Sequence, residues 1–250
     1  MTEVLTSQPE QSQRPVEIIH FRERDVIINN DSEYAHLGHQ LAELFKDGVP
    51  EDWQPLGPTQ DEYDEIDEPD HPALFGPKTG SALGEVAGVR FMVKPKYAGG
   101  IKNYNKRKEP PEYPDYTHEW SIKMARLFNS VLNEIAIAPQ VKSITASHEA
   151  QELARKYGYK SVRFIEPIIA IIDKKTGDKS LVYEYIEDAQ SMSLNIPTPR
   201  YWLDNKFVTE FDHLLWRNGI ESNDHGGEQQ FIFDKKKNLY HIDAESYSRV

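Results

Sequence analysis

The order of the predicted elements indicates an α+β fold, in which strands and helices come in separate runs. A β-rich segment punctuated by glycines occupies residues 80–96. Two helical segments, a strand pair, a further helix and a short hairpin follow it. We see no internal repeat in the chain.

Four helices are expected where apolar residues recur at helical spacing. The first begins at Ser32 and ends at Gly48, and the second begins near Thr117 or His118 and ends at Pro139. The third runs from Ser147 to Tyr157, with Gly158 as its stop. The fourth has an apolar face over 207–215 and ends at Asn218-Gly219.

The expected strands are short and bounded by turn residues. Residues 16–28 contain two β-prone runs. The stretch 161–173 is expected to pair antiparallel with 180–186 across the turn Thr176-Gly177-Asp178. Near the end of the chain, "QFIF" and "LYHID" predict a hairpin closed by the turn "DKKKN".

Composition excludes several classes of protein. With 250 residues the chain is long enough for one domain, or one domain with an extension, and its net charge of −12 argues against a protein that coats nucleic acid or an anionic membrane. The absence of cysteine excludes disulfides and thiolate chemistry. No secretory signal or membrane span is recognisable, so we expect a soluble, cytoplasmic protein.

Seven of the ten residues at 61–70 are acidic, which predicts a solvated linker or a tail that binds a basic partner.

Two aspartates stand on either side of the predicted C-terminal hairpin. Asp224 follows a helix and precedes a strand, and Asp243 ends the returning strand. Because a hairpin brings the chain back to its start, both carboxylates are expected near one small volume. Two hard oxygen ligands there suit Mg²⁺ held together with phosphates. Ordinary turn chemistry remains the alternative for Asp224.

The motifs "GIESNDHGGEQQFIF" and "YHIDAES" resemble the catalytic-loop and metal-binding motifs of the protein-kinase-like superfamily. The similarity is to its divergent, minimal branches, such as the HipA-type, lipid and small-molecule kinases. The resemblance implies Asp224 as the catalytic aspartate and Asp243 as a Mg²⁺ ligand. His225 is expected to orient the loop.

The resemblance continues upstream over residues 80–245. "GVRFMVK" looks like the strand that carries the phosphate-contacting lysine, here Lys94. The glycines just before it, including Gly84 and Gly88, are implied to cover the phosphates. Glu119 is implied to hold Lys94, with Glu134 as a competitor. "SLVYEYIED" looks like the hinge strand, where the backbone from Glu184 to Ile186 would bind adenine.

The sequence departs from the family pattern at several points. The family's metal-binding asparagine is replaced: Gln229 and Gln230 stand at the expected offsets, and Glu228 is a charged alternative. The glycines are spaced four residues apart. Only five residues follow Glu245. The resemblance therefore implies a two-lobed fold with a truncated C-lobe, divided into an extension at 1–72, an N-lobe at 73–186 and a C-lobe at 187–250.

The leading expectation is an atypical kinase-like phosphotransferase that uses ATP and Mg²⁺ on a protein Ser/Thr or a small-molecule hydroxyl. The acceptor, and a partner protein that would supply a substrate platform, are not specified by the sequence. The alternative is a pseudokinase-like module that binds a partner. A third reading is metal-dependent hydrolysis of a phosphodiester, based on the basic patch Lys94, Lys96, Lys102, Lys106, Arg107 and Lys108.

Overall fold

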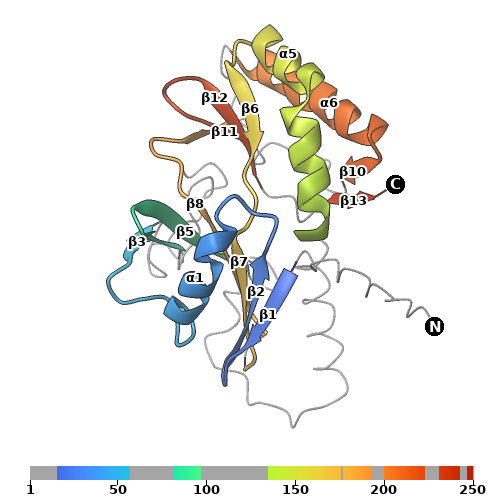
Figure 1. The fold of residues 1–250 in the computed structure, drawn as a ribbon. Coiled ribbons are helices and arrows are strands. Elements are labelled where there is room, and N and C mark those ends of the chain that lie inside the picture. Colours follow the sequence, from blue (N-terminus) through green and yellow to red (C-terminus); the bar gives the residue numbers. More distant parts are fainter. Residues whose placement is uncertain are drawn as a thin grey trace, which may run out of the picture.

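The computed structural model describes residues 16–56, 81–96, 135–175, 177–192, 200–222, 231–242 and 247–249. These residues form one large antiparallel sheet, two smaller sheets and a group of helices (Figure 1). The predicted α+β class is therefore confirmed. Within these ranges, no helix combines the length and the apolar character needed to cross a lipid bilayer.

The largest sheet has seven strands in the order β1-β2-β7-β8-β5-β4-β3, and all neighbours are antiparallel. Its strands are β1 (Val16–His20), β2 (Arg24–Asn29), β3 (Gln54–Leu56), β4 (Ser81–Val86), β5 (Val89–Lys96), β7 (Ile169–Asp173) and β8 (Lys179–Glu184). Three of them, β1 to β3, come from the segment that the sequence assigns to a polar extension. Those residues hydrogen-bond into the same sheet as the strand that carries Lys94.

Side chains of the large sheet alternate between two buried faces, as the strand repeat requires. One face packs against the 3₁₀ turn η1 (Ala35–Leu37) and the helix α1 (Gly38–Leu44), and includes Phe91, Val93 and Val182. The opposite face contributes Ile27, Ala170, Ile172, Leu181 and Tyr183, which pack with Ile135 and Ile165. The second face is the one directed toward the rest of the chain.

A second sheet has the order β6-β12-β11-β9, from β6 (Ser161–Phe164), β9 (Gln190–Ser191), β11 (Phe231–Phe233) and β12 (Asn238–His241). Its helical cover consists of the helix at 135–146, α5 (His148–Lys156) and α6 (Tyr201–Arg217), which share one apolar core with it (Figure 1). A third pairing joins β10 (Ile220–Ser222) to β13 (Tyr247–Arg249). The predicted hairpin is confirmed as β11–β12.

Two of the predicted helices are confirmed with their end signals. Ser147 caps α5, because its hydroxyl oxygen accepts a hydrogen bond of 3.2 Å from the backbone N–H of Ala150. Gly158 follows the helix with φ +84°, a left-handed conformation that glycine adopts without strain. Gly219 follows α6 in the same way, with φ +80°.

The expectation for the first helix is wrong in its start. The chain is helical only from Ala35, first as a 3₁₀ turn and then as α1. Ser32 is buried and forms a turn instead, since its hydroxyl oxygen accepts a hydrogen bond from the N–H of Tyr34. Leu44, the last residue of α1, is 39% exposed.

Pro139 does not close the second helix. The chain is helical from 135 to 146, straight through the proline. A proline removes one backbone hydrogen bond. Ile137, Val141 and Ile144 continue the buried face on both sides of it, and this burial sustains the helix. The part of the predicted helix before residue 135 lies outside the described residues.

The stretch 161–173 is not one strand. It divides into β6 and β7, which belong to different sheets. The division falls at Glu166-Pro167, where the proline has no N–H to donate to a ladder. β7 forms the predicted antiparallel pair with β8, whereas β6 pairs in parallel with β12. The two sheets are therefore joined through residues 165–168.

Candidate functional site

Lys94 lies on the inner face of the large sheet. It sits on β5 directly opposite Leu181 of β8, and directly paired residues place their side chains on the same face. Leu181 and Tyr183 belong to the cluster on the face directed toward the second sheet. Lys94 is half-buried there. The candidate phosphate-contacting lysine therefore faces the rest of the molecule rather than α1.

The residue before Asp243 packs into the same cluster. Ile242 is partly buried against the group that contains Leu181 and Tyr183. The end of β12 and the Lys94 face of the large sheet are therefore brought together across the two sheets. Asp243 itself lies outside the described residues, as do Asp224, Gln229, Gln230 and Glu119, together with the competing Glu134 and Glu228.

The strand ends that flank the two acidic motifs are paired with each other. The segment 223–230, with Asp224, connects β10 to β11, and the segment 243–246, with Asp243, connects β12 to β13. β10 is antiparallel to β13, with Ser222 opposite Tyr247. β11 is antiparallel to β12, with Phe231 opposite His241. Each of the two segments therefore connects the β10–β13 pair to the β11–β12 pair, and the two segments begin and end at neighbouring strand ends.

A buried polar contact holds the base of the Asp243 segment. The Nε2 atom of His241 lies 2.6 Å from the hydroxyl oxygen of Tyr247. Both residues are buried, and the ring of Phe231 stacks on His241 at a centroid distance of 4.7 Å. Neither His241 nor Tyr247 is among the site residues predicted from the sequence. The position of His241, two residues before the predicted metal ligand Asp243, is the sequence signal that could have indicated this contact.

The two glycines expected over the phosphates have structural reasons to be glycine. At Gly84 a Cβ atom would lie 2.1 Å from the ring of Trp53, so the indole packs directly on the β4 backbone. Gly88 has φ +79° and forms the two-residue turn between β4 and β5 together with Ala87, whose φ is +51°. A role for these glycines in covering phosphates therefore rests only on the resemblance.

The segment from Glu184 to Ile186 has the geometry of a strand edge. The N–H of Tyr185 donates to the carbonyl of Arg90 on β5 at 2.9 Å. Because backbone groups point alternately to the two sides of a strand, those of Glu184 and Ile186 point away from β5. On that side, the last pairing with β7 joins Ile169 and Val182.

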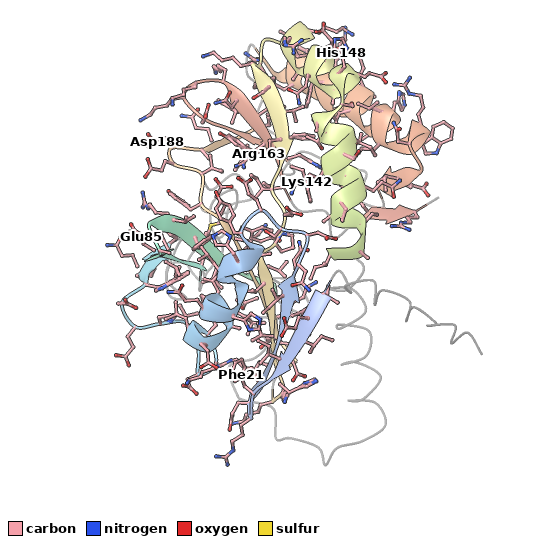
Figure 2. The ribbon with its side chains drawn as sticks, in the orientation of Figure 1. Phe21, Glu85, Lys142, His148, Arg163 and Asp188 are labelled. Carbon is pink, nitrogen blue, oxygen red and sulfur yellow. The ribbon has the colours of Figure 1, made fainter. Side chains whose placement is uncertain are left out.

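The Glu184 side chain joins the two sheets. Arg163 of β6, whose side chain is labelled in Figure 2, donates to the Glu184 carboxylate at 2.7 Å and also lies 5.5 Å from the centre of the Tyr240 ring on β12. Burial, and then the nearby carboxylate of Glu184, raise the pKa of Tyr34. This cluster of charges and aromatic rings fixes the start of the hinge-like segment relative to the second sheet.

A second polar link connects the helix at 135–146 with the junction of the sheets. Lys142, whose side chain is labelled in Figure 2, donates to the carboxylate of Glu166 at 2.6 Å. Glu166 is buried, and its other oxygen lies 3.5 Å from the Asn29 amide nitrogen. Asn29 also donates to the carbonyl of Pro167 at 3.0 Å.

A groove on the outer surface of the protein lies between α5 and α6. Its lining includes Glu149, Lys156, Glu210, Trp216 and Arg217, none of which is a predicted site residue. The charges across it are paired: Lys156 with Glu210 at 2.6 Å, and Arg217 with Glu149. These pairs hold the two helices together.

Within the described residues, no three or more histidine, aspartate or glutamate side chains gather in a way that could hold a metal ion. The aspartates expected to do so, Asp224 and Asp243, are outside those residues. The donor types nevertheless suit Mg²⁺ with phosphates, since carboxylates are hard oxygen ligands and Lys94 supplies a cation on the adjoining face.

Comparison with known proteins yields a distant structural likeness. No protein-family model and no curated protein matches the chain. Among solved structures, it is similar to a Toxoplasma gondii specific rhoptry antigen kinase domain, with a TM-score of 0.35, 13% identity, and coverage of 70% of this chain and 48% of that one. It is also similar to a rhoptry kinase from Toxoplasma gondii, with a TM-score of 0.30, 13% identity, and coverage of 70% and 44%. The chain thus spans about half the length of these structures.

Proposed function

We propose that the protein is a kinase-like phosphotransferase that binds ATP and Mg²⁺. In this proposal the large sheet forms one lobe, and the second sheet with its helices forms the other lobe. The nucleotide lies between them. The acceptor is a protein serine or threonine, or the hydroxyl of a small molecule.

One observation carries the proposal. The two segments that contain Asp224 and Asp243 begin and end at strands that pair with each other. One of those strands, β12, continues into Ile242, which packs on the sheet face that bears Lys94. These contacts of the described residues support a site to which Lys94 and the two acidic motifs all contribute.

Each residue has a role that follows from its chemistry. Lys94, held by Glu119, would contact the phosphates, and Asp243 with Gln229 or Gln230 would hold the metal. Asp224 would orient the acceptor hydroxyl or take its proton. The backbone from Glu184 to Ile186 would bind the adenine at the edge of this strand. Mg²⁺ bound with ATP supplies neutralisation of the phosphate charge, so the chain contributes mainly positioning.

The second candidate is a pseudokinase-like module that binds nucleotide or a partner without turnover. It is favoured by Gln229 and Gln230 at the positions of the metal-binding asparagine. A neutral amide on a longer side chain is a weaker and less restrained ligand than the asparagine of the family.

Thermal unfolding with and without Mg-ATP tests the proposal. A ligand that binds only the folded state raises the melting temperature by mass action, by about 2.7 kcal/mol of stability at one hundred times Kd. For a chain of this size that is a rise of about 5–10 °C. Asp243→Asn should abolish the part of the rise that depends on Mg²⁺, whereas Asp47→Asn, an isosteric change at an exposed turn, should not.

The outcomes are separable. No shift for the wild type at millimolar Mg-ATP would overturn nucleotide binding altogether. A shift with formation of ADP supports the phosphotransferase, and a shift without ADP supports the binding module. A shift of equal size in Asp243→Asn would remove Asp243 from the metal site.

A further inference from the structure

Ser81 is a buried serine whose hydroxyl has no hydrogen-bond partner. Its side chain is 1% exposed, and its Oγ atom makes no hydrogen bond within the described part of the chain. Buried hydroxyls in proteins are almost always paired, because an unpaired polar group loses its hydrogen bonds to water without replacement. An unpaired hydroxyl at a fixed place is therefore a reason to look for a ligand that pairs with it.

The strand register places Ser81 next to Lys94. In the β4–β5 pair, Ala82 lies opposite Val93, and Leu83 opposite Met92. One further step in the same register sets Ser81, the first residue of β4, opposite Lys94 of β5. Residues directly opposite on antiparallel strands have their side chains on one face, with Cβ atoms about 4.5–5.5 Å apart.

The burial pattern of the neighbours agrees with this placement. Ala82 and Val93 both belong to the cluster on the α1 face. Because side chains alternate along a strand, Ser81 and Lys94 are on the other face, together with Leu181. The serine hydroxyl and the lysine ammonium group are thus neighbouring donors on the face that the rest of the molecule covers.

We propose that Ser81 is a ligand-binding residue, whose hydroxyl donates a hydrogen bond to the phosphate group that Lys94 contacts. This inference rests on the proposed function and adds a residue to it. A hydroxyl donor and an ammonium group side by side suit an anionic oxygen, and a phosphate offers several such oxygens to both.

The variant Ser81→Ala distinguishes a ligand-binding role from a structural role, because the two roles predict opposite changes in the melting temperature of the free protein. Removing an unpaired buried hydroxyl should leave the melting temperature of the free protein unchanged or raise it by a few degrees. The same change should weaken ATP binding about tenfold, because a hydrogen bond to a charged group is lost. Adenosine, which has no phosphate, should bind the variant and the wild type equally. Titration calorimetry of both proteins with both compounds gives these values.

Ser161→Ala is the matched control. Ser161 also begins a strand, but its hydroxyl is paired with the amide oxygen of Asn238 at 3.2 Å. Its loss should lower the melting temperature slightly and leave ATP binding unchanged.

Two results would overturn the inference alone: equal ATP affinity of Ser81→Ala and wild type, or a lowered melting temperature of free Ser81→Ala. Absence of ATP binding by the wild type would instead overturn the proposed function, and this inference with it.

Discussion

The Nε2 atom of His241 lies 2.6 Å from the hydroxyl oxygen of Tyr247, and both residues are buried. His241 ends β12 and Tyr247 begins β13, so their contact closes the short segment that contains Asp243. Tyr247 is also opposite Ser222, the last residue of β10 before the Asp224 segment. One polar contact therefore braces the strand ends from which both acidic motifs extend.

Removing the Tyr247 hydroxyl should weaken both the fold and the proposed metal site. Tyr247→Phe leaves the buried Nε2 of His241 without this partner, which should lower the free energy of unfolding by about 1–3 kcal/mol. Affinity for Mg-ATP should fall more than affinity for ATP without metal, because the brace supports Asp243. Denaturant unfolding and calorimetry with and without Mg²⁺ measure the two effects.

Tyr240→Phe is the control for that variant. Its half-buried hydroxyl donates to Asp234 at 3.0 Å, close to the hairpin turn and away from the Asp243 segment. A modest loss of stability with unchanged Mg²⁺ dependence is expected. If Tyr247→Phe behaves in the same way, the brace does not position Asp243.

Breaking the Lys142–Glu166 pair should destabilise the junction of the two sheets. Lys142→Met leaves a buried carboxylate without its cation, and with the lysine partly exposed we expect a loss of about 1–3 kcal/mol. The double variant Lys142→Met/Glu166→Gln should lose less than Lys142→Met alone, because the charge itself is gone. Urea unfolding of the single and double variants measures this order.

Lys46→Met provides the comparison with an exposed pair. Lys46 and Glu43 contact each other at 3.1 Å on the surface of α1 and its C-terminal end. Such a pair contributes at most about 0.5 kcal/mol. A loss from Lys142→Met no greater than this would show that the junction does not depend on the ion pair.

Gly84→Ala should destabilise the free protein. The new Cβ atom would lie 2.1 Å from the Trp53 ring, so the indole or the strand must move, at a cost of about 1–3 kcal/mol. Gly88→Asn should cost far less, since nothing lies within 4 Å of the new Cβ and asparagine tolerates the positive φ. Melting temperatures of the two variants give the comparison; equal values would refute the packing role of Gly84.

The interaction of Glu210 on α6 with Lys156 on α5 should weaken at acid pH. Hydrogen bonds from Lys156 and then from Tyr157 hold the pKa of Glu210 below its ordinary value. A depressed folded-state pKa stabilises the protein above the unfolded value, about 4.3, and this contribution is lost as the pH falls through the folded value.

Glu210→Gln should therefore lower the melting temperature by about 1–3 °C at pH 7, and the difference should shrink below about pH 4. High salt should reduce it too, because the pair is largely exposed. Thermal melts of both proteins from pH 3 to 7 give the profile. A difference that stays constant down to pH 3 would show that the carboxylate charge is not the cause.

The elements with strong local signals were predictable. Ser147 and Gly158 bound α5, and the turn "DKKKN" between two apolar runs specifies the β11–β12 hairpin. In each case the deciding interactions lie within a few residues of each other along the chain. The prediction that Ser32 begins a helix was wrong. A serine hydroxyl can accept a backbone hydrogen bond either at a helix start or in a turn, and nothing nearby in the sequence distinguishes these two roles.

The predictions that were wrong concern features that depend on contacts with residues distant in the sequence. Pro139 reads as a helix end, yet the buried neighbours Ile137 and Val141 carry the helix past it. The apolar run from 161 to 173 reads as one strand, yet its first part pairs with β12 from the end of the chain. The packing of the Trp53 ring on Gly84 also depends on a distant partner, and no local pattern predicts it.

By itself the sequence determined the α+β class, most of the local elements and the order of the charged motifs, because these follow from side-chain periodicity, caps and turns. Only the tertiary structure decided that Lys94, Ser81 and Ile242 share one region, and that β10 pairs with β13. Those arrangements depend on which faces are buried against one another: Ile220 and Tyr247, far apart in sequence, are both buried in one core. No local pattern encodes that choice, since it is made by the packing of the whole chain.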